Sequence, residues 1–181
     1  MQKSFTNDAD FLKSLDMVSV VKGFDKFNIP RVAQLSQRSN QFNLRTVRYT
    51  DAEIFAIEKN DNYVTFSFTL KDKFGDNGLI CVIILNKKNT ETLFVDTWFM
   101  SCRVLKRGME NFALNTIVEW AKINGFKKIV GEYLPTAKNA MVEQHYPNLG
   151  FTKIEGGETM QYVLDVNSYK PFECYIKRII E

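Results

Sequence analysis

The chain has 181 residues, of which 45% are hydrophobic and 13% aromatic. This is enough apolar material for one well-filled core and too little for two ordinary domains. The formal charge of +3 is spread over segments of mixed sign. Because basic residues adjoin only in pairs such as Lys87/Lys88 and Lys127/Lys128, no stripe follows a phosphate backbone, and a nucleic-acid partner is not expected.

Three cysteines, Cys81, Cys102 and Cys174, are too few and too scattered for a disulfide framework, and with the single histidine they show no metal-ligand spacing. We therefore expect no metal and a cytoplasmic location. The first residues, MQKSFTNDAD, contain no apolar signal core, and no apolar run approaches the roughly 20 residues of a membrane span. A membrane partner and N-terminal processing are not expected.

Residues 1–45 differ in pattern from the rest of the chain. NDADFLKSL predicts a short helix with carboxylates in its first turn, where the helix dipole favours them. IPRVAQLSQRSNQFN predicts a second helix with Pro30 at its first position. We interpret this part as an N-terminal helical extension packed on the main domain, which covers residues 46–181 with its core at about 46–166 and a short C-terminal tail.

The main domain begins with TVRYT as a predicted strand and DAEIFAIEKN as a helix opened by Thr50 or Asp51. YVTFSFTL alternates with the period of two of a half-buried strand. GLICVIIL is apolar throughout, which indicates a central strand buried on both faces. The residues KDKFGDNG between these two strands predict a hairpin loop with positive φ angles.

The next predicted elements are a strand in TLFVDTWFM and a helix from about Gly108 to Asn124, with Gly125 as its stop. KKIVGEYL is the following strand, and this spacing implies a right-handed parallel crossover. TAKNAMVEQHY predicts a helix, and FTKIEGGETMQYVLDV predicts two closing strands around a glycine pair. The fold class is therefore α/β with a mixed sheet.

The stretch FMSCRVLKRGMENFALN takes the chain from a strand directly into a helix. Such a junction leaves several backbone N–H groups facing one space, and the helix dipole adds positive charge there. Gly108 would allow a ligand to come close, and Arg103 and Arg107 would add charge-assisted hydrogen bonds to a phosphate. On spacing alone the favoured interpretation is an arginine-rich surface cap on a core helix, because these residues are common at helix starts.

A second motif, YPNLGF, lies further along the chain, from Tyr146 to Phe151. With these two motifs the chain resembles the GNAT superfamily of N-acetyltransferases, in which an RxxGxG or QxxGxG/A turn binds pyrophosphate at the head of the central helix. A tyrosine of that superfamily precedes the glycine of a terminal GF by four residues. Here the turn runs from Arg103 to Gly108, and the second motif runs from Tyr146 to Phe151. Lys106 stands where the family has the first glycine of the turn. The resemblance implies an acyl-CoA N-acyltransferase fold whose parallel strands splay at the cofactor site.

A narrower resemblance rests on four blocks in order: RVAQLSQRSNQFNLRTVRYT, LKDKFGDNGLI, MSCRVLKRGME and PTAKNAMVEQHYPNLGF. They are similar to the C-terminal, acetyltransferase-like region of FkbH-like proteins. In that family an N-terminal phosphatase-like domain of the haloacid dehalogenase (HAD) type loads a glyceryl unit onto an acyl carrier protein. This chain lacks the DxDx(T/V) loop of that domain. It is therefore expected to be either a lone acetyltransferase-like protein or a part separated from a HAD-type partner.

The resemblance implies acyl-CoA or acyl-phosphopantetheine as co-substrate, with its thioester along the splayed strands near residues 97–102 and 130–134. Its phosphates would lie on the turn formed by Cys102, Arg103, Val104, Leu105, Lys106, Arg107, Gly108 and Met109. Tyr146 would protonate the leaving thiolate, Glu132 would act as a base through water, and Asn139 would bind the pantetheine amide.

Each of these residues also has an ordinary structural interpretation. Tyr146 would be a boundary aromatic with a wet hydroxyl, Glu132 a solvated strand-edge carboxylate, and Asn139 a local cap. Cys102 is either an acyl relay in an electropositive place or a buried apolar cysteine. His145 is interpreted as a surface histidine rather than a base.

Two functions stay open at this point. One is an acyltransferase that acts on a small-molecule acceptor. The other is a non-catalytic module that docks an acyl carrier protein beside a HAD-type domain. Carrier proteins are usually acidic, so the docking surface would combine the basic residues Arg31, Arg38, Arg45, Arg48, Arg103, Lys106 and Arg107 if they share a face.

Overall fold

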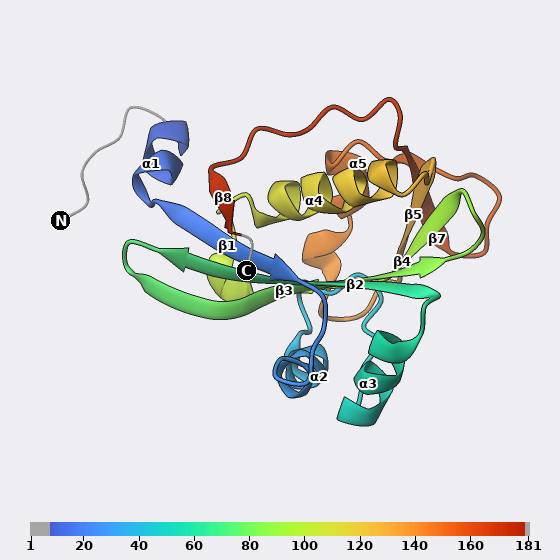
Figure 1. The fold of residues 1–181 in the computed structure, drawn as a ribbon. Helices are drawn as coiled ribbons and strands as arrows, with labels where there is room; N and C mark the ends of the chain where they lie inside the picture. Colours follow the sequence, from blue (N-terminus) through green and yellow to red (C-terminus); the bar gives the residue numbers. More distant parts are fainter. Residues whose placement is uncertain (1–7, 180–181) are drawn as a thin grey trace.

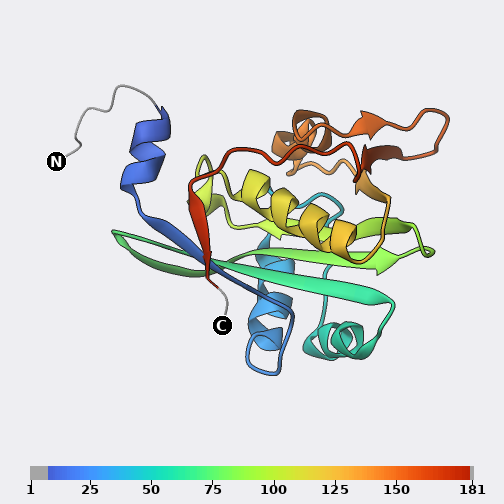
Figure 2. The ribbon, with the colours of Figure 1, turned by 45° about the horizontal axis from the view of Figure 1, so that its top comes forward.

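The structure is a computed structural model, and it describes residues 8–179. An eight-stranded sheet forms its centre, in the order β6-β7-β5-β4-β3-β2-β1-β8. Helices α2 (Ile29–Arg38) and α3 (Asp51–Lys59) cover one face, and α4 (Met109–Ile123) covers the other (Figure 1 and Figure 2). Within residues 8–179, no helix combines the length and apolar character needed to cross a membrane.

Strand pairing makes the sheet mixed, as the sequence predicts. The strands are β1 Met17–Lys22, β2 Tyr63–Asp72, β3 Gly75–Lys87, β4 Thr92–Met100, β5 Lys128–Tyr133, β6 Thr152–Lys153, β7 Met160–Asp165 and β8 Ile176–Ile179. The pairs β4/β5 and β1/β8 are parallel, and the other neighbours are antiparallel. Helix α4 connects β4 to β5, which is the predicted crossover.

The best-predicted elements are those at the centre. In β2, Phe66, Phe68 and Leu70 are buried, and β3 is buried continuously from Ile80 to Leu85. The two strands extend into the predicted loop, so that the turn between them holds only residues 73 and 74. Helix α4 ends before Gly125, whose φ of +79° is the left-handed conformation expected of a glycine stop.

The N-terminal part is more than the predicted pair of helices. Helices α1 (Asp8–Ser14) and α2 are present, but the segment between them forms β1, which pairs with β2 and β8. Its alternate side chains Met17, Ser19 and Val21 are buried. Residues before 45 and after 166 therefore both contribute strands to the central sheet.

Two predicted elements are wrong. Residues 46–50 form no strand, because they bond to the end of α2: Tyr49 N–H donates to Ser36 Oγ at 3.0 Å, and Thr46 has a φ of +53°. The predicted helix over 136–146 is broken into a 3₁₀ turn, η2 (Ala140–Val142), and one turn of helix, α5 (His145–Asn148). The side chain of Asn139 bonds to backbone groups outside this segment and interrupts it.

Helix α3 begins with a complete capping box, as Thr50 predicts. Thr50 Oγ1 accepts from the Glu53 N–H, and the Glu53 carboxylate accepts from the Thr50 N–H, both at 3.1 Å. We predict that Thr50→Ala lowers the free energy of unfolding by about 1 kcal/mol, because the Glu53 N–H loses its side-chain acceptor. Urea denaturation measures this, with Thr50→Ser as the control. Equal stability of the alanine and serine variants would contradict it.

Candidate functional site: the gap between β4 and β5

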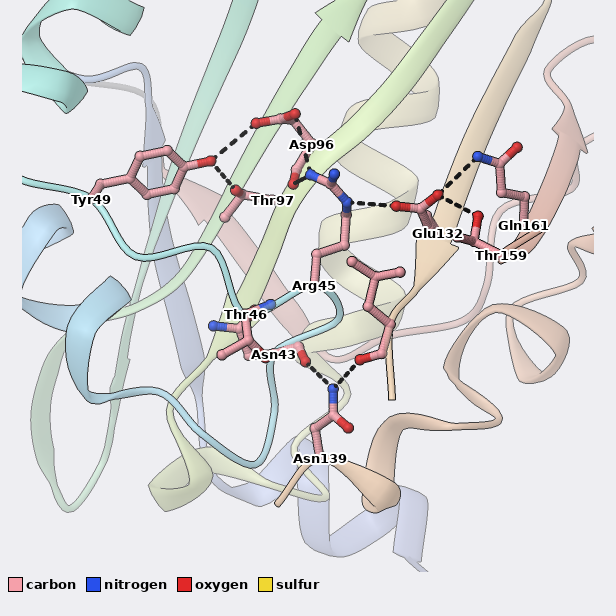
Figure 3. A network of polar contacts seen from close by, with 11 residues as sticks. Asn43, Arg45, Thr46, Tyr49, Asp96, Thr97, Glu132, Asn139, Thr159 and Gln161 are labelled. Atoms are coloured by element: carbon pink, nitrogen blue, oxygen red, sulfur yellow. Dashed lines mark hydrogen bonds and ion pairs between the residues drawn. The ribbon is translucent and has the colours of Figure 1, made fainter. Parts of the chain in front are cut away.

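Strands β4 and β5 pair only over their first halves, from Thr92/Lys128 to Val95/Gly131. Beyond these pairs the two strands separate, and the gap between them is where the resemblance places the thioester. In this structure the gap is filled by the segment Phe42–Arg45, which we call the gap segment (Figure 3). The expected open slot is therefore closed by the chain itself.

The backbone of the gap segment bonds to both separated strands. Leu44 N–H donates to Trp98 O at 3.2 Å, and Met100 N–H donates to Phe42 O at 3.0 Å, so the segment forms an antiparallel bridge to β4. On the other side, Leu134 N–H, one residue after β5, donates to Leu44 O at 2.9 Å. Leu44 thus completes the sheet where β4 and β5 no longer contact each other.

Asn139 holds the gap segment in place. Its side-chain N–H groups donate to Asn43 O at 2.9 Å and to Leu134 O at 3.0 Å, and its side-chain oxygen accepts from Thr136 N–H at 2.8 Å. The side chain is fully buried. The residue predicted to bind a pantetheine amide therefore binds backbone amides of its own chain.

Arg45 joins the two strands through their carboxylates (Figure 3). Its Nε donates to Glu132 Oε1 at 3.0 Å, and its Nη1 donates to the Asp96 carbonyl oxygen at 2.6 Å and lies 3.3 Å from the Asp96 carboxylate. Arg45 is thus placed at the centre of the gap by contacts with both β4 and β5. Sequence reasoning had assigned it to a docking surface.

Glu132 is buried rather than a solvated edge carboxylate. Its second oxygen accepts from Thr159 Oγ1 at 2.7 Å and from Gln161 Nε2 at 2.9 Å. Burial alone would raise the pKa of this carboxyl, but the hydrogen bonds from Gln161, Thr159 and Arg45 outweigh it and lower the pKa. With both oxygens occupied, Glu132 is a poor base in this arrangement.

Tyr146 lies beneath the gap with its ring against the backbone of β5. A Cβ at Gly131 would be 2.3 Å from the ring, so only glycine admits the tyrosine here. The hydroxyl is buried and has no hydrogen-bond partner among residues 8–179, so the wet-hydroxyl interpretation is wrong. Burial raises the pKa of this hydroxyl, which stays protonated at physiological pH.

Other unpartnered polar atoms gather around the same gap. His145 Nε2 and Thr46 Oγ1 are buried without a partner in the described part of the chain. The His145 ring lies edge-on to Trp98 at 4.4 Å and to Phe42 at 5.2 Å between ring centroids. His145 is therefore a buried residue, and its interpretation as a surface histidine is wrong.

The turn before α4 has the conformation of a glycine-rich turn. Lys106 has a φ of +63° and Gly108 a φ of +84°, so Lys106 adopts the left-handed backbone that favours glycine. Its side chain is exposed. This turn leads directly into α4, whose first N–H groups have no acceptor within the helix. The backbone here presents free donors at a helix N-terminus.

The remaining predicted phosphate ligands divide into core and surface. Val104 and Met109 are buried in the core, so their side chains do not face a ligand. The Arg107 guanidinium lies 5.9 Å from the ring centroid of Phe11 in α1. Cys102, at the start of the 3₁₀ turn η1 (Cys102–Val104), is exposed, and its Sγ is 3.3 Å from Gln41 Oε1. The buried-cysteine interpretation is wrong.

A cavity of about 910 Å³ lies beside the turn and the gap. It is bounded by α2, residues 39–42, the end of β4 and residues 137–138, and Arg31, Arg38 and Arg103 line it. Of the other predicted docking residues, Arg45 lies in the gap and Arg48 bonds to carbonyl oxygens at the end of α2. Among residues 8–179, no group of three or more His, Cys, Asp or Glu side chains fits a metal ion.

No family model and no curated protein sequence matches the chain. Solved structures do. The GNAT domain of PAT from S. lividans is 15% identical, with 80% of this chain and 89% of that one covered and a TM-score of 0.63. Spermidine/spermine N-acetyltransferase SpeG from Vibrio cholerae is 12% identical, with 85% of this chain and 96% of that one covered and a TM-score of 0.60.

A third solved structure carries a ligand. YncA from Salmonella typhimurium, solved with its cofactor acetyl-CoA, is 16% identical over 88% of this chain and 99% of that one, with a TM-score of 0.57. The chain has the GNAT fold. In this structure the turn at 103–108 precedes α4, and the ring of Tyr146 packs against Gly131 of β5.

Sequence reasoning missed the gap segment. It extended the second helix through Asn43, whereas α2 ends at Arg38. The available signal was the alternation of apolar Phe42 and Leu44 around a polar residue, which is typical of a strand. In this structure the segment forms a single bridge to β4, and it supplies the site with Asn43 and Arg45.

His145 is the chain's only histidine, so its effect on stability is directly measurable. Burial lowers its pKa to about 3 in the folded state, below the ordinary 6.5. The unfolded chain therefore binds the proton first, and stability falls as pH drops from about 7 toward 3. We expect a loss of about 2 kcal/mol at pH 5 from this group.

The measurement is urea denaturation at pH 7.5 and pH 5, on the wild type and on His145→Phe. The variant removes the titrating group and keeps an aromatic ring among Phe42 and Trp98. Its stability should change by about 2 kcal/mol less between the two pH values than that of the wild type. The same pH dependence in both proteins would show that His145 is not held neutral.

Proposed function

We propose that the chain is an acyltransferase of the GNAT type, whose donor is acyl-CoA or an acyl-phosphopantetheine carrier and whose acceptor is a small molecule. The observation that carries this proposal is the left-handed backbone of Lys106. A lysine in this conformation costs about 1 kcal/mol relative to glycine, and the turn that it forms leads into the free N–H groups at the start of α4. This is the arrangement that a pyrophosphate requires.

The residues present fit such a donor in two parts. The turn at 105–108 fits the phosphates, with Lys106 exposed beside it. The gap fits the amide-containing arm only when the gap segment withdraws. Withdrawal would free Trp98 O, Met100 N–H, Leu134 N–H and the Asn139 amide, which are hydrogen-bonding groups complementary to the arm's own amides.

The donor, when bound, supplies an acyl group as a thioester. Tyr146 would hold a proton at its hydroxyl for the leaving sulfur, because burial keeps the pKa of this group high. Gly131 fixes the ring of Tyr146 against β5. Withdrawal of Arg45 would also remove one of the three partners that lower the pKa of Glu132, beside Gln161 and Thr159, so the same movement would make this carboxylate a better base.

A second candidate is favoured by the closed gap. If the gap segment never leaves, the chain is a non-catalytic module that docks an acyl carrier protein, in an FkbH-like context beside a HAD-type domain. The hydrogen bonds of Leu44 to both strands support this alternative. The two candidates differ in whether Leu44 gives up those bonds.

Hydrogen exchange at the Leu44 amide separates them. With saturating acetyl-CoA, we expect faster exchange at Leu44, which loses its bond to Trp98 O, and slower exchange at Leu105–Gly108. Desulfo-CoA, which has the phosphates and the arm without a thioester, is the control and should act in the same way. A Leu44 amide that stays protected while an acyl carrier protein binds would favour the docking module.

Substitution of Tyr146 tests the chemical step. We predict that Tyr146→Phe lowers the rate of thiol release from acetyl-CoA at least 100-fold, because the leaving sulfur loses its proton donor. The affinity of this variant for acetyl-CoA should stay within about twofold of the wild-type affinity. Tyr162→Phe, at a neighbouring buried ring 5.8 Å away, is the matched control and should retain the rate. Full activity in Tyr146→Phe would remove the proposed acid.

A further inference from the structure

The cavity beside the gap is electropositive. Arg31, Arg38, Arg103 and Lys138 line it, and no aspartate or glutamate does. None of these four side chains has an ion-pair partner in residues 8–179. At about 910 Å³, the cavity is within the size range of small-molecule sites, roughly 300–1,000 Å³.

The cavity is built from fixed elements rather than from free side chains alone. Arg31 and Arg38 are seven residues apart in α2, two turns of one helix, and therefore project from the same face. Arg103 follows the end of β4 and is fixed by a bond between its backbone N–H and Ser101 Oγ at 3.3 Å. Three cations, two from α2 and one from the end of β4, therefore line one space.

Apolar side chains complete the lining. Leu35, Phe42 and Met100 contribute to the wall and are buried. A ligand that fits both features carries negative charge and an apolar portion. A polycation is excluded by repulsion, since no carboxylate in the lining would balance it.

The cavity adjoins the gap directly. Phe42 and Met100 both line it, and the bond from Met100 N–H to Phe42 O is part of the bridge that closes the gap. A molecule in the cavity would therefore lie next to the place proposed for the thioester. The geometry gives the cavity the position of an acceptor site.

We propose that this cavity binds the acyl acceptor, and that the acceptor is a small organic anion with a phosphate or carboxylate head group and an apolar portion. Arg31 and Arg38 would bind the head group through charge-assisted hydrogen bonds. The role of the bound anion as acyl acceptor rests on the proposed acyl transfer. Anion binding in the cavity does not depend on that transfer.

Binding is measured by calorimetry without any acyl donor, so the cavity is tested alone. The probes are phenyl phosphate, benzoate, inorganic phosphate and benzylamine. We expect phenyl phosphate and benzoate to bind, inorganic phosphate to bind more weakly, and benzylamine not to bind. Benzylamine binding as tight as that of phenyl phosphate would overturn the proposal.

Variants locate the site. Arg31→Gln combined with Arg38→Gln should weaken phenyl phosphate binding at least tenfold. Lys122→Gln combined with Lys128→Gln removes the same two charges at exposed positions outside the cavity lining and should change the affinity less than twofold. Because Arg38 and Lys138 are both exposed, their double glutamine variant is a second test that does not risk the fold. Unchanged binding in either cavity variant would overturn the assignment.

Competition separates this proposal from the proposed function. If phenyl phosphate binds as expected and acetyl-CoA does not bind at all, the anion site stands and the acyltransferase falls. If acetyl-CoA binds and displaces phenyl phosphate, the cavity holds the donor's own phosphates, and the acceptor role is overturned. Simultaneous binding of both is the result expected for a donor and an acceptor.

Discussion

The site depends on one constraint: two parallel strands separate halfway along their length, and something must satisfy the backbone groups that they no longer share. In this chain Leu44 does so, through its N–H to β4 and its carbonyl to the residue after β5. Arg45 then lies between Asp96 and Glu132 and forms an ion pair with each. Removal of Arg45 would leave two partly buried carboxylates without a counter-charge, which is destabilising.

In the closed arrangement the backbone groups at the gap are hydrogen-bonded, whereas several buried side-chain groups beside it are not. Tyr146 and His145 each keep a buried polar atom without a partner among residues 8–179, and each such atom costs roughly 1–3 kcal/mol. The same segment that completes the sheet therefore sits among unpaired donors and acceptors. A preference of about 2 kcal/mol for the closed gap would weaken donor binding about 30-fold, because only the open fraction binds. In that case the gap segment would compete, as a tethered part of the chain, with any molecule that enters the gap.

The sequence predicts the centre of the fold well because β2, β3 and α4 have strong apolar periodicity, and their burial follows it. The failures share a cause: long-range hydrogen bonds decide the local structure. Residues 46–50 bond to the end of α2 instead of to a strand, and Asn139 breaks the predicted helix by bonding to Asn43 and Leu134. The positions of the turn and of Tyr146 came from a motif, but their surroundings did not. No local pattern indicates that Glu132 meets Arg45, which is 87 residues away.

The cavity and the gap share structural parts, so their occupants affect each other. Phe42 lines the cavity with its side chain while its carbonyl closes the gap through Met100. If the gap segment withdraws, the cavity wall at Phe42 changes as well. A ligand that packs against Phe42 in its present place would therefore stabilise the closed gap and weaken binding in the gap. By linkage, a ligand in the gap would weaken binding in the cavity by the same free energy. Because Phe42 also contacts His145, which contacts Trp98 and Tyr146, the coupling passes through directly packed rings that end at the proposed acid.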